Sequence, residues 1–204
     1  MTSTTVTIAN QSLTSVKESE NISNVTIFTD VGSLTLDKDA WSKITTDAGN
    51  NSVVCLEQES DTAETGASQI YEITATVNGK EIYTEGNADG SVEVDVPYNG
   101  NAPTVYYLGP DGAEKIDSSH KDGILSWTVE HFSFYAVCAE EQEASVTTSA
   151  GKTTCYDTLE GAIDFAQDGD TVKLLKDVIV ESVHLSDSLM KLSYNISQHN
   201  EIQK

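Results

Sequence analysis

Tyr98, Tyr106 and Tyr107 are the residues whose type and spacing best suit the binding of a ligand. They lie close together along the chain, around one predicted hairpin, and tyrosine rings stack on the apolar faces of sugars. The sequence therefore suggests a weak carbohydrate site at these three residues. Tyrosines also occupy alternating core and edge positions in β-sandwiches, and that ordinary packing role explains the same pattern.

A second group of candidate ligands lies in the segment Glu85-Gly86-Asn87-Ala88-Asp89-Gly90. Oxygen-bearing side chains alternate along it and a glycine follows at the sixth position, which is the order of a calcium-binding loop. Asn87 and Asp89 are therefore the candidate calcium ligands. Val96 stands where such a loop has its bidentate glutamate, and a plain hairpin loop explains the segment as well. We expect no cofactor, with Ca²⁺ as the one weak alternative.

No arrangement of nucleophile and base predicts an enzyme. Ser118-Ser119-His120-Lys121 and Ser188-Leu189-Met190-Lys191 match the Ser-x-x-Lys motif of penicillin-interacting enzymes. That mechanism requires the serine at a helix start and further motifs, which are missing here. The four histidines are dispersed, and His131 is expected to be a hydrogen-bonded residue at a corner of the fold. We therefore expect a protein without catalytic residues.

The charge of the chain excludes several partners. Its 204 residues carry a formal net charge of -22, and all eleven basic residues are lysines. Such an acidic protein repels nucleic acid and anionic membrane surfaces. No apolar stretch approaches the roughly 20 residues that span a bilayer. The acidity suits a solvated extracellular surface that prevents aggregation. The more specific alternative is that the acidic residues bind cations.

Three cysteines, Cys55, Cys138 and Cys155, are too few and too scattered to predict a zinc site or a disulfide framework. Their odd number leaves at least one thiol unpaired. A bridge between Cys55 and Cys138 is one alternative, because both residues lie on predicted strands. The sequence does not give the register that such a bridge needs.

Residues 4–140 carry the pattern of an antiparallel β-sandwich, immunoglobulin-like or jelly-roll-like, with short helices. About ten short β-rich stretches are separated by turns of Gly, Asn and Asp at the spacing of a sandwich. From Trp127 to Cys138, large apolar and polar residues alternate, which predicts half-buried strands with one face in water. In Asp37-Lys38-Asp39-Ala40-Trp41-Ser42-Lys43-Ile44, an aspartate is expected to cap a short helix. The expected buried face of this helix comprises Ala40, Trp41 and Ile44.

The pattern changes after Glu140-Glu141-Gln142-Glu143, and we expect a second unit over residues 144–185. Asp157-Thr158-Leu159-Glu160 fits a capping box with Asp157 as the N-cap, and it predicts a helix of about ten residues. The expected buried stripe of this helix comprises Leu159, Ala162, Ile163 and Ala166. Strands at 171–175 and 178–183 follow. Residues 186–204 show no usable period and are expected to form a disordered or loosely packed tail.

Two groups of motifs resemble a module of large secreted wall proteins of Gram-positive bacteria. The first group is Val25-Thr26-Ile27 through Thr29-Asp30-Val31-Gly32-Ser33-Leu34-Thr35-Leu36-Asp37, with Ala40 and Ile44 after it. The second group is Val92-Glu93-Val94-Asp95-Val96-Pro97-Tyr98, Val105-Tyr106-Tyr107-Leu108, Asp111-Gly112 and His131-Phe132-Ser133-Phe134-Tyr135-Ala136-Val137. The resemblance covers about residues 4–140. Such modules occur in long surface proteins of Firmicutes, often with S-layer homology repeats, and the resemblance implies a stalk or an adhesive spacer.

The second unit is similar to the opening of right-handed parallel β-helix domains of the pectate-lyase type. The similarity rests on Tyr156-Asp157-Thr158-Leu159-Glu160-Gly161-Ala162-Ile163 and Asp168-Gly169-Asp170-Thr171-Val172-Lys173-Leu174-Leu175-Lys176-Asp177. It implies a short helix that caps a stack of strands. Leu192-Ser193-Tyr194-Asn195 replaces the step that usually continues the family, so we expect a truncated cap. No residue of this chain matches a catalytic residue of such lyases, so the resemblance does not imply lyase activity.

These observations lead to a secreted or cell-surface bacterial protein with a non-catalytic, structural or adhesive role. The start of the chain lacks the basic and apolar regions of a signal peptide, so we expect a signal upstream or a fragment of a longer multidomain chain. Glycans of the cell wall, host or diet, or other surface proteins, are the expected partners. The alternative is a carbohydrate-binding module, or a fragment of a larger β-helix enzyme that degrades glycans.

Overall fold

The computed structural model describes residues 2–9, 21–48, 51–59, 69–77, 79–178 and 201–203. For residues 2–9, 47–48, 51–59 and 201–203, only the backbone is described. The fold is mainly β, with 49% strand and 12% helix, and its strand pairs are antiparallel. This confirms the expected mainly β class with short helices.

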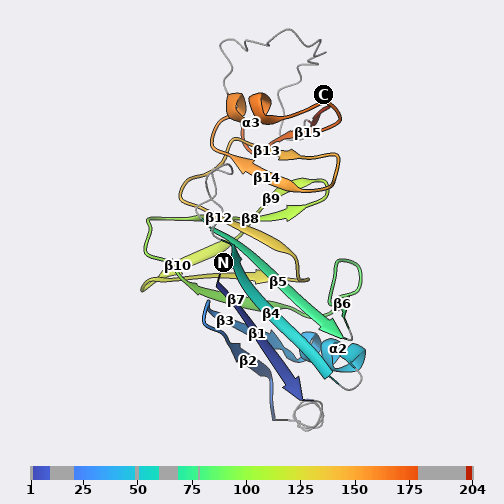
Figure 1. The fold of residues 1–204 in the computed structure, drawn as a ribbon. Coiled ribbons are helices and arrows are strands. Elements are labelled where there is room, and N and C mark those ends of the chain that lie inside the picture. Colours follow the sequence, from blue (N-terminus) through green and yellow to red (C-terminus); the bar gives the residue numbers. More distant parts are fainter. Residues whose placement is uncertain are drawn as a thin grey trace.

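One sheet of the sandwich has seven strands in the order β1-β4-β5-β12-β8-β9, with β6 paired to β5 (Figure 1). The strands are β1 (Thr2–Ala9), β4 (Asn51–Glu59), β5 (Gln69–Val77), β6 (Lys80–Ile82), β8 (Thr104–Gly109), β9 (Gly112–Ile116) and β12 (Phe134–Cys138). Strand β12 pairs with β5 on one side and β8 on the other, through Tyr135 opposite Tyr71 and Tyr107. A central strand of this sheet thus comes from a late part of the sequence.

The facing sheet has five strands in the order β10-β11-β7-β3-β2. They are β2 (Asn24–Phe28), β3 (Ser33–Asp37), β7 (Val92–Pro97), β10 (Ser118–Lys121) and β11 (Ile124–Val129). In β7 the buried residues Val92, Val94 and Val96 alternate with more exposed acidic residues. Period-two alternation therefore orients this strand, as expected for a sheet with one face on the core.

Aromatic side chains connect the two sheets across the core. Trp127 of β11 lies with its ring centroid 5.7 Å from that of Tyr71 and 6.2 Å from that of Tyr135. Tyr135 in turn lies 5.9 Å from Tyr107, ring centroid to ring centroid. Trp127, Tyr71 and Tyr135 are almost fully buried, so their packing fixes the separation of the layers over β5, β12 and β8.

Helix α2 (Lys38–Ala48) covers one end of the sandwich and buries Ala40, Trp41 and Ile44, as predicted. Asp37 caps it, because its Oδ1 accepts hydrogen bonds from the backbone amides of Asp39 and Ala40, at 3.1 and 2.8 Å. The second carboxylate oxygen accepts from the amide and hydroxyl of Ser91, at 2.8 and 2.9 Å. One side chain thus caps the helix and ties it to the segment that enters β7.

The C-terminal unit comprises residues 144–178 and 201–203, and its sheet has the order β14-β13-β15-β16. Its elements are β13 (Ala144–Thr147), β14 (Thr153–Tyr156), α3 (Leu159–Phe165), β15 (Thr171–Leu174) and β16 (Glu201–Gln203). The helix packs on this sheet through the predicted stripe Leu159, Ala162, Ile163 and Ala166. The strand pairs described in this unit are antiparallel, and its resemblance to a β-helix cap stays a prediction.

Three expectations for the C-terminal unit are wrong in detail. The N-cap of α3 is Thr158, whose hydroxyl accepts from the amide of Gly161 at 3.1 Å, so the helix begins one residue later than the capping box placed it. It is also shorter, at seven residues. Residues 201–203 of the expected loose tail form β16, which pairs with β15. Residues 179–200, with most of the predicted strand 178–183, lie outside the described residues.

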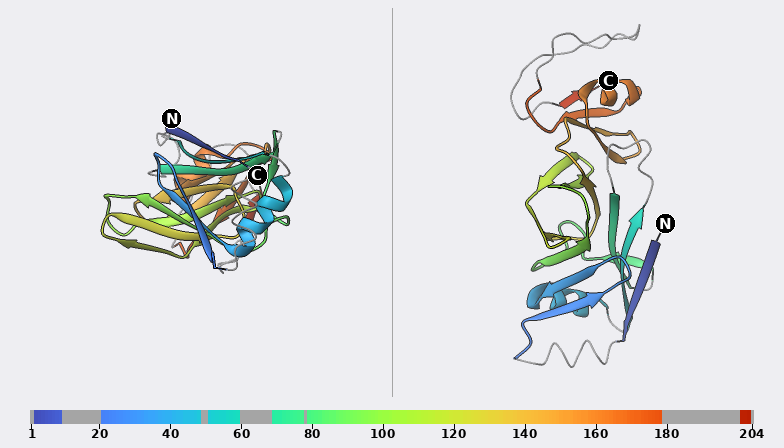
Figure 2. Two further views of the ribbon diagram at one scale, coloured as in Figure 1. Left: turned by 90° about the horizontal axis from the view of Figure 1, so that it is seen from below. Right: turned by 90° about the vertical axis from the view of Figure 1, so that its left-hand side faces the viewer.

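The C-terminal unit lies at one end of the sandwich, beside β8 and β9, so that the molecule is elongated (Figures 1 and 2).

Both faces of β12 are buried where the sandwich meets the C-terminal unit, including the face that was expected to be in water. Tyr135 and Val137 face the sandwich core, whereas Ala136 and Cys138 face a second cluster that contains Cys155 of β14. The expectation of one solvated face is therefore wrong at this end, because a segment that follows in the sequence folds back over the sheet.

Candidate functional site

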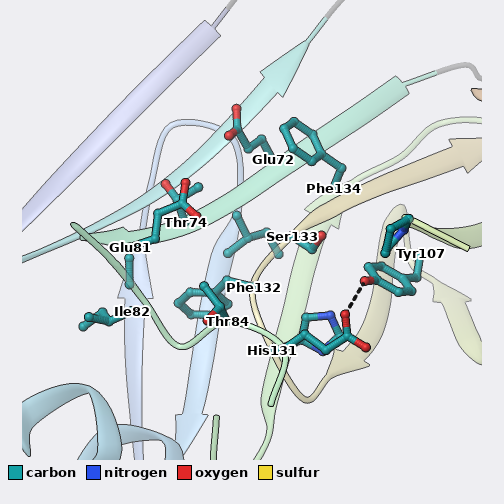
Figure 3. A pocket seen from close by; sticks show the side chains of 14 residues that line it. Glu72, Thr74, Glu81, Ile82, Thr84, Tyr107, His131, Phe132, Ser133 and Phe134 are labelled. Atoms are coloured by element: carbon teal, nitrogen blue, oxygen red, sulfur yellow. Dashed lines mark hydrogen bonds between the residues drawn. The ribbon is translucent and has the colours of Figure 1, made fainter. Parts of the chain in front are cut away.

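A pocket of about 260 Å³ opens where β5 and β6 meet the loop between β11 and β12 (Figure 3). We call it the His131 pocket. Its carboxylates are those of Glu72, Glu81 and Glu85. Its rings are those of Tyr107, His131, Phe132 and Phe134. The pocket thus combines apolar ring surface with acidic groups at its edge.

Three hydrogen bonds hold the loop that carries His131. The hydroxyl of Tyr135 donates to the carbonyl oxygen of His131 at 2.8 Å. The backbone amide of Phe132 donates to the carbonyl of Tyr83, and the amide of Ile73 donates to the carbonyl of Ser133, each at 2.9 Å. The loop is therefore fixed to both neighbouring strands, and the pocket is largely preformed.

The rings of Tyr107 and His131 lie side by side in the lining of the pocket, with their centroids 5.0 Å apart and their planes at 89° (Figure 3). The Tyr107 hydroxyl donates a hydrogen bond to Oε2 of Glu85 at 3.5 Å. Burial, reinforced by the negative charge of Glu85, raises the pKa of Tyr107. The hydroxyl therefore stays protonated at neutral pH and acts as a hydrogen-bond donor.

The chemistry of the pocket suits a neutral ligand rich in hydroxyl groups. Glutamate side chains accept hydrogen bonds, and exposed rings provide flat apolar surface. Nε2 of His131 is buried and has no hydrogen-bond partner among the described residues. Anionic ligands would be repelled, because three carboxylates are among the lining residues of the pocket.

The structure separates the three tyrosines that the sequence suggested as one carbohydrate site. Tyr98 is 7% exposed and packs in the sandwich core, and Tyr106 is 1% exposed and lies in the second cluster, which faces the C-terminal unit. Tyr107 lines the His131 pocket, whereas Tyr98 and Tyr106 do not. Neighbouring residues of a strand point to opposite faces, so Tyr106 and Tyr107 cannot form a common platform. The expected three-tyrosine platform is therefore corrected to Tyr107 alone.

The calcium ligands that the sequence suggested are also engaged elsewhere. Oδ1 of Asn87 accepts a hydrogen bond from the ammonium group of Lys43 at 3.0 Å, and a cation beside it disfavours Ca²⁺. Oδ1 of Asp89 accepts from the amide of Gly90 at 3.1 Å. Within the described part of the chain, no three acidic, histidine or cysteine residues cluster as metal ligands. The plain hairpin loop that was the other expectation is also wrong, because the segment connects β6 of one sheet with β7 of the facing sheet.

The remaining motifs stand apart from the pocket. Ser118 and Lys121 lie on β10, where a separation of three residues places side chains on opposite faces. The mechanism of the Ser-x-x-Lys enzymes needs them on one helical turn. The second Ser-x-x-Lys match, from Ser188 to Lys191, lies outside the described residues.

The second cluster belongs to a contact surface between the sandwich and the C-terminal unit. We call this surface the joint. The sandwich contributes Tyr106, Gly109, Ala113 and Cys138. The segment after β12 contributes Gln142, Ser145, Thr153 and Cys155.

Hydrogen bonds cross the joint at several points. The Tyr106 hydroxyl accepts from the amide of Gln142 at 2.8 Å, and Oγ of Ser145 accepts from the amide of Ala113 at 3.2 Å. The Thr153 hydroxyl donates to the carbonyl of Gly109 at 2.6 Å. These donors and acceptors are buried, so their loss would leave unsatisfied polar groups. The joint is therefore a packed interface with paired polar groups.

The acidic segment that predicted a boundary is bonded to the C-terminal unit through Glu143 and to the sandwich through Glu141. The amide of Glu143 donates to the carbonyl of Tyr156 at 3.0 Å, and its carbonyl accepts from the amide of Leu175 at 2.9 Å. Its Oε2 accepts from the amide of Leu159 at 3.0 Å. Lys115 forms an ion pair of 2.8 Å with the neighbouring Glu141. The run of carboxylates at which the sequence predicts a boundary is thus a structured connection.

Sequence reasoning missed the joint and most of the pocket. Ala136 and Cys138, apolar residues at outward positions of an alternating strand, were the available signal for a covered face. Phe134, which is 41% exposed at the edge of the His131 pocket, was a similar signal. Nothing in the sequence distinguishes the glutamates of the pocket from the other acidic residues, because 33 of them are spread along the chain.

Comparison with protein-family models, curated proteins and solved structures found no match to this chain. Among the described residues, no helix is both long enough and apolar enough to cross a membrane.

Proposed function

We propose that this chain is a non-catalytic structural module of a secreted or cell-surface bacterial protein, in which it acts as a spacer. The resemblance of residues 4–140 to wall-protein modules supports the location. The joint supports the spacer role, because buried hydrogen bonds from Tyr106, Ser145 and Thr153 join two units end to end.

The joint is the single observation that carries this proposal. A flexible linker lets neighbouring units change their separation, whereas a packed interface fixes their orientation. Tyr106 is 1% exposed and Gln142 is 2% exposed, so water is excluded from the bond between them. The net charge of -22 keeps such a rod soluble and separates it from its neighbours.

Small-angle X-ray scattering of the purified chain tests the spacer role. We expect one narrow distribution of distances, with the length of the elongated arrangement in Figure 1. Tyr106→Ala should broaden this distribution, because it removes the ring and the hydroxyl from the joint. Tyr107→Ala is the matched control, since its ring faces the His131 pocket, and it should leave the distribution unchanged. A broad distribution for the unaltered chain would contradict the proposal.

An assay against a polysaccharide panel tests the non-catalytic part of the proposal. We expect no release of reducing ends above a blank. Release that His131→Ala abolishes, while Phe28→Ala retains it, would refute the proposal. Phe28 suits this control because its ring is 78% exposed on the edge strand β2 and takes no part in the pocket.

Glycan binding at the His131 pocket is a second candidate function. The observation that favours it is the meeting of Tyr107 and Phe134 with three glutamates in one preformed pocket. Isothermal titration with neutral oligosaccharides tests it. Tyr107→Ala and Phe134→Ala should each weaken binding at least about tenfold, and Phe28→Ala should not. Equal affinities in all variants would dispose of this candidate.

A further inference from the structure

Two buried thiols from different sheets meet in the joint. Cys138 is the last residue of β12 and is fully buried, and Cys155 lies in β14 with 1% exposure. Both are free and both belong to the second cluster, with Tyr106 and Ala136 as neighbours. The two side chains are packed in the same small buried cluster, and the Cys138 thiol is near enough to raise the pKa of Cys155. The joint therefore holds a pair of cysteines, one from each unit.

We propose that Cys138 and Cys155 form a disulfide that locks the C-terminal unit onto the sandwich when the protein meets an oxidising thiol pool. The two cysteine side chains are packed in one buried cluster between two sheets, and a disulfide forms from such packing when the Cβ atoms face each other. Such bonds form and persist outside the cell. The inference rests on the joint alone and holds whether or not the chain is a spacer.

The reaction is a thiol–disulfide exchange with a small-molecule disulfide as oxidant. The thiolate of one cysteine attacks a sulfur of the small disulfide, and one small thiolate leaves. The thiolate of the second cysteine then attacks the protein sulfur of this mixed disulfide and releases the other small thiolate. The protein loses two thiol hydrogens and two electrons, and the small disulfide is reduced to two thiols.

The position of the pair explains why this bond would form in preference to others. The side chain of Cys138 faces away from the sandwich core and toward β14, as does the ring of Tyr106. The hydrogen bond to Cys138 and the burial of the thiol raise the pKa of Cys155. Exchange therefore begins when the joint opens or during folding, and the second step is fast once the units close.

Peptide mapping after oxidation tests the inference. The unaltered chain and Cys55→Ser are incubated with oxidised glutathione in urea below the unfolding transition, and remaining thiols are blocked before digestion. We expect a cross-linked peptide pair that contains Cys138 and Cys155, with a mass lower by two hydrogens than the reduced pair. Stable mixed disulfides with glutathione, free thiols at both positions, or a bridge to Cys55 would overturn the proposal.

A thermal measurement separates a lock between the units from an incidental bond. The oxidised protein should melt roughly 5 °C or more above the reduced protein, and dithiothreitol should reverse the difference. Cys155→Ser is the matched control, and its melting temperature should not respond to oxidation. An oxidised protein that melts no higher than the reduced one would contradict the proposed lock, whatever the mapping shows.

Discussion

The phenol oxygen of Tyr106 accepts a hydrogen bond of 2.8 Å from the backbone amide of Gln142. Tyr106 lies on β8 of the sandwich, and Gln142 lies in the segment that leads to the C-terminal unit. Both residues are buried, so the bond has no competition from water. A single side chain thus turns an acidic connecting segment into part of a packed joint.

Tyr106→Phe should destabilise the protein by about 1–2 kcal/mol, because it leaves the buried amide of Gln142 without a partner. The free energy of unfolding in urea measures this loss. Tyr107→Phe is the matched control, since its hydroxyl makes a longer bond of 3.5 Å to an exposed carboxylate and should cost less. An equal decrease in the free energy of unfolding in the two variants would mean that the buried Tyr106 bond stabilises the joint no more than the exposed Tyr107 bond stabilises the pocket.

Gly90→Ala should destabilise the protein by more than about 2 kcal/mol. Gly90 has a positive φ of 74°, and a Cβ there would collide with Asp37 Oδ1 and the amide of Ala40. The substitution therefore adds steric conflict at the helix cap to backbone strain. Gly86→Ala separates the two effects, because Gly86 has a φ of 71° but open space around it. Thermal midpoints that fall equally in both variants would exclude a role for the cap contact.

Asp37→Ala should reduce stability by about 2 kcal/mol at neutral pH. The variant removes the cap of α2 and both bonds to Ser91. Asp39→Ala is the control, because it removes a carboxylate from the same helical turn but leaves the cap intact. Urea unfolding of the three proteins measures the differences. An Asp39 variant as unstable as the Asp37 variant would show that the capping bonds are unimportant.

The contribution of Asp37 should also depend on pH. Burial acts to raise its pKa, but hydrogen bonds from Ala40, Ser91 and Asp39 outweigh burial and lower the pKa below 3.8. A lowered folded-state pKa gives stability that is fully present above the unfolded-state value and is lost as the pH falls through the folded-state value. The stability gap between the unaltered chain and Asp37→Ala should therefore narrow in acid. A gap that is constant down to strongly acidic pH would contradict this account.

Several tyrosines should resist ionisation in the folded protein. Burial, with a smaller effect of Tyr98, raises the pKa of Tyr71 to about 12, and burial likewise raises the pKa of Tyr83 and Tyr135. The contribution of these protonated tyrosines to the stability of the fold is fully present below the unfolded-state pKa of 10.0. It is lost as the pH rises through the folded-state pKa values. At about pH 11 the ultraviolet absorbance of tyrosinate should be well below that of the denatured chain. Equal absorbance in both states would show that these rings are accessible.

The order and type of most elements were predictable because local physics determines them. Alternating valines orient β7, and the apolar stripe of Ala40, Trp41 and Ile44 orients α2. The N-cap of α3 was predicted one residue too early, since Asp157 and Thr158 both accept hydrogen bonds well. Competition between two adjacent capping residues is settled by packing, which a sequence does not show.

The candidate site was much less predictable than the strands. Tyr107 lines the His131 pocket, whereas Tyr98 and Tyr106, which were grouped with it because they are near in sequence, do not. A strand sends adjacent side chains to opposite faces, and only strand pairing shows which face is covered. A bridge between Cys55 and Cys138 was only one alternative, and it followed from strand positions alone. In the structure Cys138 contacts Cys155, and the side chain of Cys55 lies outside the described residues.

The amino-acid sequence by itself determined the mainly β class, the two regions on either side of the acidic segment, and the acidic surface. These properties follow from composition, period-two alternation and turn residues, all of which act over a few neighbouring positions. Only the tertiary structure decided that the outward side of Ala136 and Cys138 is covered, and that Tyr107 and His131 share a pocket. Such contacts join residues far apart in the chain, and their free energy comes from excluding water between surfaces that no local pattern brings together.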